Sequence, residues 1–220
     1  MKPELERIRN RARDVEIHYV DQGLHVMPKR MVEVLQKKVQ EVSYATRIVL
    51  GYGLCGNGIV GLSSNNKPLV VPRCHDCTAL FLGSQAAYAK MLDARPGALF
   101  LTPGLLEQRK DPLSRFEEDY VPRVGHENAE WTIRTELKNY THFILIDTGG
   151  TDIVALRERT LENVAFFKKQ YEEIHVKLEY FEKLLLGPYT DEDFFILGAG
   201  EKVTQDLFFQ KYGKAPMLRE

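Results

Sequence analysis

The chain has 220 residues, with 30 basic and 31 acidic side chains and a net charge of −1. This length suits a single α/β unit over residues 1–220, and 44% hydrophobic residues are typical of globular proteins. No apolar run approaches the roughly 20 residues of a membrane span, and no block of one charge sign favours nucleic acid or anionic lipid. We therefore expect no membrane and no nucleic acid as partners.

The first twenty residues, MKPELERIRNRARDVEIHYV, are charged throughout. A secretory signal needs an apolar stretch before a small-residue cleavage site, and this segment has none. The expected location is the cytoplasm. Three cysteines are too few for a disulfide scaffold, which agrees with that expectation.

Short aliphatic or β-branched runs recur along the chain and predict strands, while most of the segments between them have the three-and-four apolar spacing of helices. Strands are expected at residues 15–20, 47–53, 69–72, 98–102, 142–147, 176–180 and 194–198, and helices at 28–44, 78–92, 127–140, 152–171 and 202–212. Strands that are apolar throughout suit a parallel sheet covered on both faces. The alternation predicts an α/β fold with a doubly wound, mostly parallel sheet.

Two stretches of the chain echo one another. ATRIVLGYGLCGNG and YTHFILIDTGGTDI both place a threonine before an aliphatic run that ends in a glycine-rich turn. This predicts two similar Rossmann-like halves, 1–125 and 126–220, with a cleft between them and the cysteines in the first half only. The alternative, that any two βα units look alike at this level, stays open.

All three cysteines follow the ends of two consecutive predicted strands. Cys55 lies two residues past the run 47–53, and Cys74 and Cys77 follow the run 69–72 in a C-x-x-C spacing. The carboxyl ends of neighbouring strands in an open α/β sheet face one crevice, so the three sulfurs can converge there. The free N–H groups at a helix start also favour thiolates.

Three thiolates with one vacant position describe a catalytic zinc site or a [4Fe–4S] cluster with an open iron. The leading hypothesis is a metalloprotein with Cys55, Cys74 and Cys77 as ligands, working as a metal-dependent transferase or lyase on a small, thiol-related substrate. With His75 as a fourth ligand, the site would be structural. Two alternatives stay open: a dithiol oxidoreductase using Cys74 and Cys77, and a non-enzymatic metal-delivery or accessory protein.

Glycine and polar residues near the strand ends are candidates for binding substrate or supporting the metal ligands. Glycine permits the tight turns and close backbone approach that such a site needs. The candidates are Gly53, Gly56, Asn57, Gly58, Arg73, His75 and Asp76 in the first half, and Asp147, Gly149 and Gly200 in the second.

The segments YGLCGNG, LVVPRCHDC, LFLGS and LTPG resemble a family of bacterial and archaeal proteins catalogued as domain of unknown function 1638. The resemblance covers most of the chain, and the family's cysteine pattern falls on Cys55, Cys74 and Cys77. Members are often encoded near corrinoid-dependent methyltransferases, so the resemblance implies methyl or one-carbon metabolism, with a corrinoid protein or methyltransferase as partner. It implies no particular reaction. A homo-oligomer also stays open.

Overall fold

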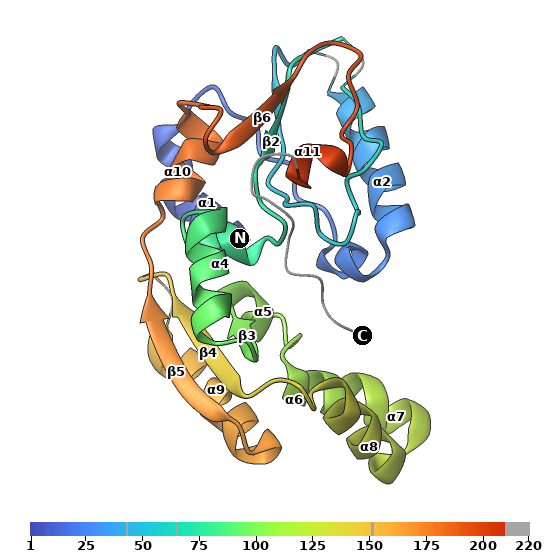
Figure 1. Ribbon diagram of the computed structural model, residues 1–220, viewed down its shortest axis with the longest axis vertical. Helices are drawn as coiled ribbons and strands as arrows, with labels where there is room; N and C mark the ends of the chain where they lie inside the picture. The colour runs from blue at the N-terminus through green and yellow to red at the C-terminus, as the bar shows by residue number, and fades with distance from the viewer. Residues whose placement is uncertain (43, 65, 151, 210–220) are drawn as a thin grey trace. The chain divides into compact units, whose positions relative to one another are not determined.

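The computed structural model describes residues 1–42, 44–64, 66–150 and 152–209 (Figure 1). The chain divides into two compact units. Unit 1 consists of Met1–Ile8 and Ala86–Leu178, and unit 2 consists of Arg9–Gln85 and the part that starts at Glu179. Each unit is thus assembled from two separate segments, and the division does not follow the sequence halves 1–125 and 126–220.

Unit 1 is built on a parallel sheet in the order β3 (Ala98–Leu101), β4 (His142–Asp147), β5 (Gln170–His175). The central strand β4 buries Phe143 to Ile146 completely, as expected for a strand covered on both faces. The outer strand β5 is charged instead. Its Glu172 and Glu173 pair with Arg95 at 2.9 Å and Arg157 at 2.7 Å.

Helices and short helical turns surround this sheet (Figure 1). They are α1 (Lys2–Ile8), α4 (Gln85–Ala94), α5 (Pro103–Glu107), α6 (Pro112–Ser114), the π-helical turn η3 (Arg115–Tyr120), α7 (Val121–Val124), α8 (His126–Glu136) and α9 (Ile153–Phe167). Gly125 separates α7 from α8 with a φ of 76°, which favours glycine. The core of unit 1 includes Leu101, Phe116, Ile133, Phe143, Leu145, Leu156 and Phe167.

Unit 2 is built on a second sheet in the order β1 (Ile48–Val49), β2 (Leu69–Pro72), β6 (Phe194–Leu197). β2 pairs in parallel with β1 and antiparallel with β6, and all four of its residues are buried. The surrounding elements are η1 (Arg9–Arg11), η2 (Gln22–Val26), α2 (Pro28–Glu41), α3 (Thr78–Phe81), α10 (Glu179–Leu186) and α11 (Asp206–Phe209).

The long helix α2 of unit 2 follows from its sequence. It begins with Pro28, whose fixed φ suits the first turn of a helix. It buries Met31, Leu35 and Val39, which are four residues apart and therefore share one face. These side chains join the core formed by Leu54, Ile59, Leu62, Leu69, Val71 and Phe195.

The α/β class and the predominance of parallel pairing are confirmed, but the strands form two sheets of three. No doubly wound sheet is seen among the described residues. The reason is that each central strand is already paired on both edges within its own unit: β2 with β1 and β6, and β4 with β3 and β5. The antiparallel β6 also departs from the expected parallel arrangement.

Two predicted strands are wrong. Residues 15–20 form no strand, and at 176–180 the strand β5 has already ended at His175 before α10 begins at Glu179. The helix expected at 78–92 is divided by Gly83, whose φ of 86° is incompatible with a continuous helix. The helix expected at 202–212 is the short α11, and residues 210–212 lie outside the described residues.

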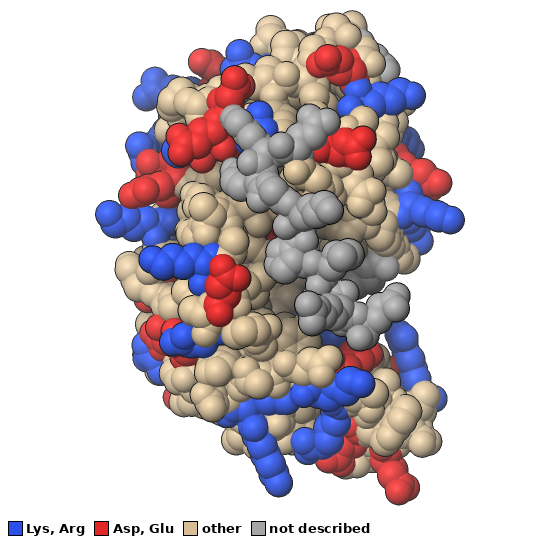
Figure 2. Space-filling view, viewed as in Figure 1, with Lys and Arg blue, Asp and Glu red and all other residues tan. Residues whose placement is uncertain are grey.

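Charge is distributed evenly on the face shown in Figure 2, where basic and acidic side chains are interspersed. On this face neither sign forms a continuous patch. In the described part of the chain, every helix is too short or too polar to cross a lipid bilayer.

A buried polar network stabilises unit 1. Asp111 is fully buried and accepts hydrogen bonds from the Ser114 N–H at 3.1 Å, the Ser114 hydroxyl at 2.5 Å and the Asn163 amide at 2.7 Å. Arg159 Nε lies 3.3 Å from the same carboxylate. Burial raises the pKa of Asp111, but the hydrogen bonds and the Arg159 charge outweigh it, so the net shift is downward.

We expect Asp111→Ala to lower the free energy of unfolding by about 3 kcal/mol, because it leaves buried donors and Arg159 without their acceptor. Asp93→Ala on α4, an exposed position, should change the free energy of unfolding by less than about 0.5 kcal/mol.

The same network makes stability depend on pH. Since the pKa of Asp111 is lowered in the folded protein, its contribution to the free energy of unfolding is complete above its unfolded pKa of about 4. That contribution is lost as the pH falls through the folded pKa. Urea titrations at pH 7 and pH 3 measure both effects. Equal losses for the two variants would contradict this account.

Candidate functional site

The two cysteine-bearing loops run side by side because the pairing of β1 with β2 continues past the ends of the strands. Leu50 N–H donates to Val70 O at 2.9 Å, Leu54 N–H to Cys74 O at 2.9 Å, and Cys55 N–H to His75 O at 3.1 Å. The last two bonds keep the parallel order beyond the strands. They bring Cys55 to the same place as the start of α3.

Gly53 allows the two loops to approach this closely. A Cβ atom at this position would lie 2.8 Å from Cys74 O and 3.3 Å from Asp76 N, both of which are backbone atoms that cannot move aside easily. The Gly53 N–H also donates to Cys77 Sγ at 3.4 Å. Gly53 thus sets the spacing of the loops and contacts one of the thiols.

The turn after Gly53 has an uncommon backbone. Cys55, Gly56 and Asn57 have φ angles of 47°, 61° and 71°. Glycine and asparagine tolerate this left-handed region, whereas a cysteine enters it rarely. Such a conformation persists only where the surroundings impose it, and it concentrates at functional sites. Here it is Cys55 that takes the unfavourable conformation.

Cys55 and Cys77 form a pair of thiols. Their Sγ atoms are 2.8 Å apart, both side chains are partly buried, and both are free cysteines. The hydrogen bond with Cys55, burial and the charge of Cys55 raise the pKa of Cys77 well above its usual value, although the Gly53 N–H opposes the shift. Cys77 therefore keeps its proton near pH 7, and either sulfur can act as the donor in the contact between them.

Cys74 is fully buried. Burial and the charges of Cys77 and Asp76 raise the pKa of its thiol. Among the described residues no hydrogen bond joins Cys74 Sγ to Cys77 Sγ, and no group of three or more His, Cys, Asp or Glu side chains has the arrangement of a metal site. The structure thus brings the sulfur atoms of Cys55 and Cys77 into contact. Among the described residues, Cys74 Sγ makes no such contact with either of them.

The residues beside the cysteines have structural partners. Asp76 accepts a hydrogen bond at 2.6 Å from the N–H of Thr78, the first residue of α3. The His75 ring packs against Phe208 and Phe209 of α11, with centroids 6.2 and 5.1 Å away. Burial lowers the pKa of His75 although a hydrogen bond from its ring to the Phe208 backbone opposes the shift, so His75 is neutral near pH 7.

The remaining candidates in unit 2 have separate roles. Arg73 donates to Phe194 O at 3.0 Å and lies 3.8 Å above the Phe195 ring, so it is engaged with β6. Gly58 packs against Met31, because a Cβ atom there would lie 2.8 Å from Met31 Sδ. Gly200 lies in the loop after β6 with a φ of 80°.

Sequence reasoning missed Tyr52, which lies near the thiol pair. Burial raises the pKa of Tyr52, and the charges of Cys77 and Cys55 raise it further. A neutral phenol thus stands close to the sulfurs. Its position three residues before Cys55, in a glycine-flanked loop, was the only signal that could have identified it.

Asp147 and Gly149 belong to unit 1, whereas the cysteines belong to unit 2. Asp147 Oδ2 pairs with His175 Nδ1 at 2.9 Å, and its Oδ1 accepts the Gly149 N–H at 2.7 Å. Gly149 has a φ of 71°, and the His175 ring lies next to it. His175 was not expected here, because the charged strand β5 resembles a helix in sequence.

These features define an α/β protein with a cysteine pair on two adjoining strand-end loops. Residues 19–185 match the family model described as "Protein of unknown function (DUF1638)", and the chain belongs to this family. The matched span includes all three cysteines and the β1–β2 pair. Comparisons with curated proteins and with solved structures found no match.

Gly53→Ala tests how the loops hold the thiols together. The added methyl group meets backbone at 2.8 Å, so we expect unfolding to become easier by about 2 kcal/mol. Formation of a Cys55–Cys77 disulfide, followed by mass spectrometry after mild oxidation, should also slow. Gly198→Ala is the matched control, because its methyl group would lie 3.4 Å from the flexible Glu201 side chain. Unchanged stability and oxidation in Gly53→Ala would contradict the proposed role of Gly53.

Proposed function

We propose that Cys55 and Cys77 form a redox-active dithiol that exchanges with the disulfide of a small molecule or a protein. The observation that carries this proposal is the 2.8 Å separation of their sulfur atoms. A pair in this contact needs only a small movement to reach the roughly 2.05 Å of an S–S bond. The C-x-x-C spacing offered Cys74 and Cys77 as an alternative pair for this chemistry.

Cys77 supports a division of roles within the pair. Its contact with Cys55 and its burial raise its pKa, so we assign Cys55 as the attacking thiol and Cys77 as the thiol that resolves the intermediate. Cys55 thiolate attacks one sulfur of a disulfide R–S–S–R and releases R–S⁻, forming a mixed disulfide. Cys77 then loses its proton and attacks Cys55 Sγ, releasing the second thiol. The dithiol and R–S–S–R become a protein disulfide and two R–SH.

Cys74 has no step in this mechanism, because its thiol is buried and without contact to solvent. The Gly53 N–H stabilises negative charge on Cys77 during the second step, as N–H donors do for thiolates. We place the protein in the cytoplasm, where the thiol pool returns such a disulfide to the dithiol.

The test uses oxidised glutathione as the probe disulfide. The reduced protein should release two glutathione molecules per chain as a single disulfide forms. Cys74→Ala should retain this release, whereas Cys55→Ser and Cys77→Ser should lose it and stop at a mixed disulfide at most. Thiol counting and mass spectrometry measure each product. Loss in Cys74→Ala together with retention in Cys55→Ser would overturn the assignment.

A second candidate function is the three-cysteine metal centre, holding zinc or a [4Fe–4S] cluster. It is favoured by the backbone pairing of the two cysteine-bearing loops, in which Leu54 N–H donates to Cys74 O at 2.9 Å, and by the position of Cys74 three residues before Cys77. A cation bound by Cys55, Cys74 and Cys77 would stabilise all three as thiolates. Such a centre would catalyse a transferase or lyase reaction on a small one-carbon substrate. Alternatively, it would deliver a metal ion to a corrinoid protein or methyltransferase. These partners rest on the family resemblance alone.

Anaerobic purification with elemental analysis and an absorption spectrum tests this candidate. We expect about one zinc ion per chain, or a brown protein if a cluster is bound. Cys74→Ala separates the two candidates, because it removes a metal ligand but leaves the Cys55–Cys77 dithiol intact. Metal-free protein with unchanged glutathione release in Cys74→Ala would contradict the metal centre.

A further inference from the structure

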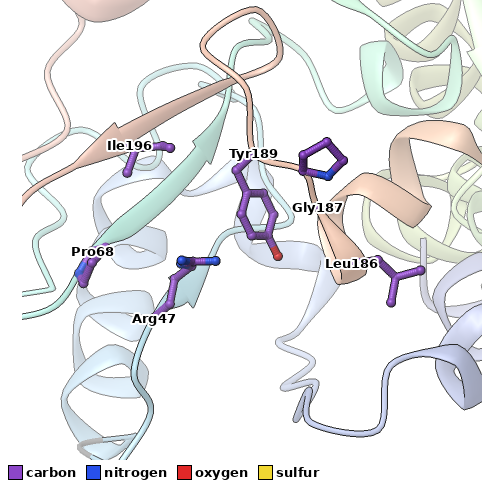
Figure 3. Close-up of a pocket in the computed structure, with 7 residues that line it drawn as sticks. Arg47, Pro68, Leu186, Gly187, Tyr189 and Ile196 are labelled. Atoms are coloured by element: carbon purple, nitrogen blue, oxygen red, sulfur yellow. The ribbon is translucent and has the colours of Figure 1, made fainter.

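Unit 2 contains a pocket at the edge of its sheet opposite to the cysteines. Arg47 and Pro68 immediately precede the parallel strands β1 and β2, whereas the cysteines follow them. The pocket has a volume of about 360 Å³ (Figure 3). This volume is within the range of small-molecule sites. Its lining includes Arg47, Pro68, Leu186, Pro188, Tyr189 and Ile196.

The pocket combines apolar side chains with one charged side chain, and polar atoms contribute a substantial part of its surface. Leu186 and Ile196 are large aliphatic residues and are 44% and 49% exposed, although side chains of this kind are normally covered. Arg47 is the only charged residue in the lining. No carboxylate pairs with Arg47 in the part of the chain that the structure describes.

Tyr189 forms a fixed wall of the pocket and stands between Arg47 and Leu186 in Figure 3. Its hydroxyl donates to Leu184 O at 3.1 Å, and its ring packs edge-on against Phe194 with centroids 5.3 Å apart. The guanidinium of Arg47 lies 5.1 Å from the ring centroid, a cation–π distance that orients it beside the pocket. Burial raises the pKa of Tyr189 although Arg47 opposes the shift, so the phenol is neutral and leaves the Arg47 charge uncompensated.

We propose that this pocket binds a small monocarboxylate with a flat apolar body. The planar guanidinium matches a carboxylate through two parallel hydrogen bonds. A single cation balances one negative charge, whereas a phosphate dianion would need further donors that the lining lacks. The Tyr189 ring and the two prolines offer flat surfaces to an apolar body, and Leu186 and Ile196 would be covered by it.

Benzoate is the probe, and benzamide is the matched neutral compound of the same shape. Calorimetric titration of the full chain should detect benzoate binding, with benzamide at least about tenfold weaker, since a hydrogen bond to a charged group is worth that ratio or more. Arg47→Gln should weaken benzoate binding by a similar factor. Arg30→Gln on α2 is the control with the same loss of charge at an exposed site.

Ile196→Ser adds a test of the apolar wall, and it should weaken benzoate and benzamide alike. Circular dichroism of each variant shows whether unit 2 remains folded. Benzoate affinity that is equal in Arg47→Gln and the unsubstituted protein, or absent in the latter, would overturn the proposal. This result is independent of the thiol chemistry, because none of the cysteines lines the pocket.

Discussion

The site depends on the continuation of parallel backbone pairing beyond the ends of β1 and β2. Two hydrogen bonds, from Leu54 N–H to Cys74 O and from Cys55 N–H to His75 O, hold the loops in the register of the strands. Gly53 makes this possible, because a larger residue would collide with the opposite backbone. All four residues of β2 are buried, so the loops extend from a strand that is held firmly in the core. The positions of Cys55 and Cys77 are therefore fixed by the backbone.

The chemistry of the pair follows from this backbone arrangement. The short contact between the two sulfurs, together with burial, raises the pKa of Cys77 well above its usual value, so the two thiols of the pair are not equivalent. The Gly53 N–H is the only backbone donor that contacts a thiol in the described part of the chain. The left-handed backbone at Cys55 costs on the order of 1 kcal/mol. The backbone hydrogen bonds between the two loops offset this cost. An inert buried cysteine needs none of these features.

Much of the fold could be predicted from the sequence where burial dominates. β2 and β4 were expected at their observed bounds. A short run that is apolar on both faces is stable only in the interior of a covered sheet. α2 was expected because its apolar residues share one face. β5 was missed, since its glutamates are stabilised by Arg95 and Arg157, which are distant in sequence. Residues 15–20 have strand-like composition but find no pairing partner.

The three cysteines were predicted to converge, but the spacing along the chain does not show that Cys55 and Cys77 make the close contact. The C-x-x-C motif links Cys74 and Cys77 along the chain, whereas the strand register brings Cys55 to Cys77. The register depends on how two segments pair, so it cannot be predicted from the sequence of either segment alone. The pairing of Asp147 with His175 was missed for the same reason, because it depends on how β4 aligns with β5.

The central claim is that Cys55 and Cys77 are neighbours in the folded protein. Proteolytic peptide mapping after brief treatment of the native protein with diamide tests it most directly, because a linkage forms fastest between the closest thiols. The account predicts a single crosslinked peptide pair that contains Cys55 and Cys77, with Cys74 recovered as a free thiol. A crosslink between Cys74 and Cys77, with Cys55 free, would contradict it.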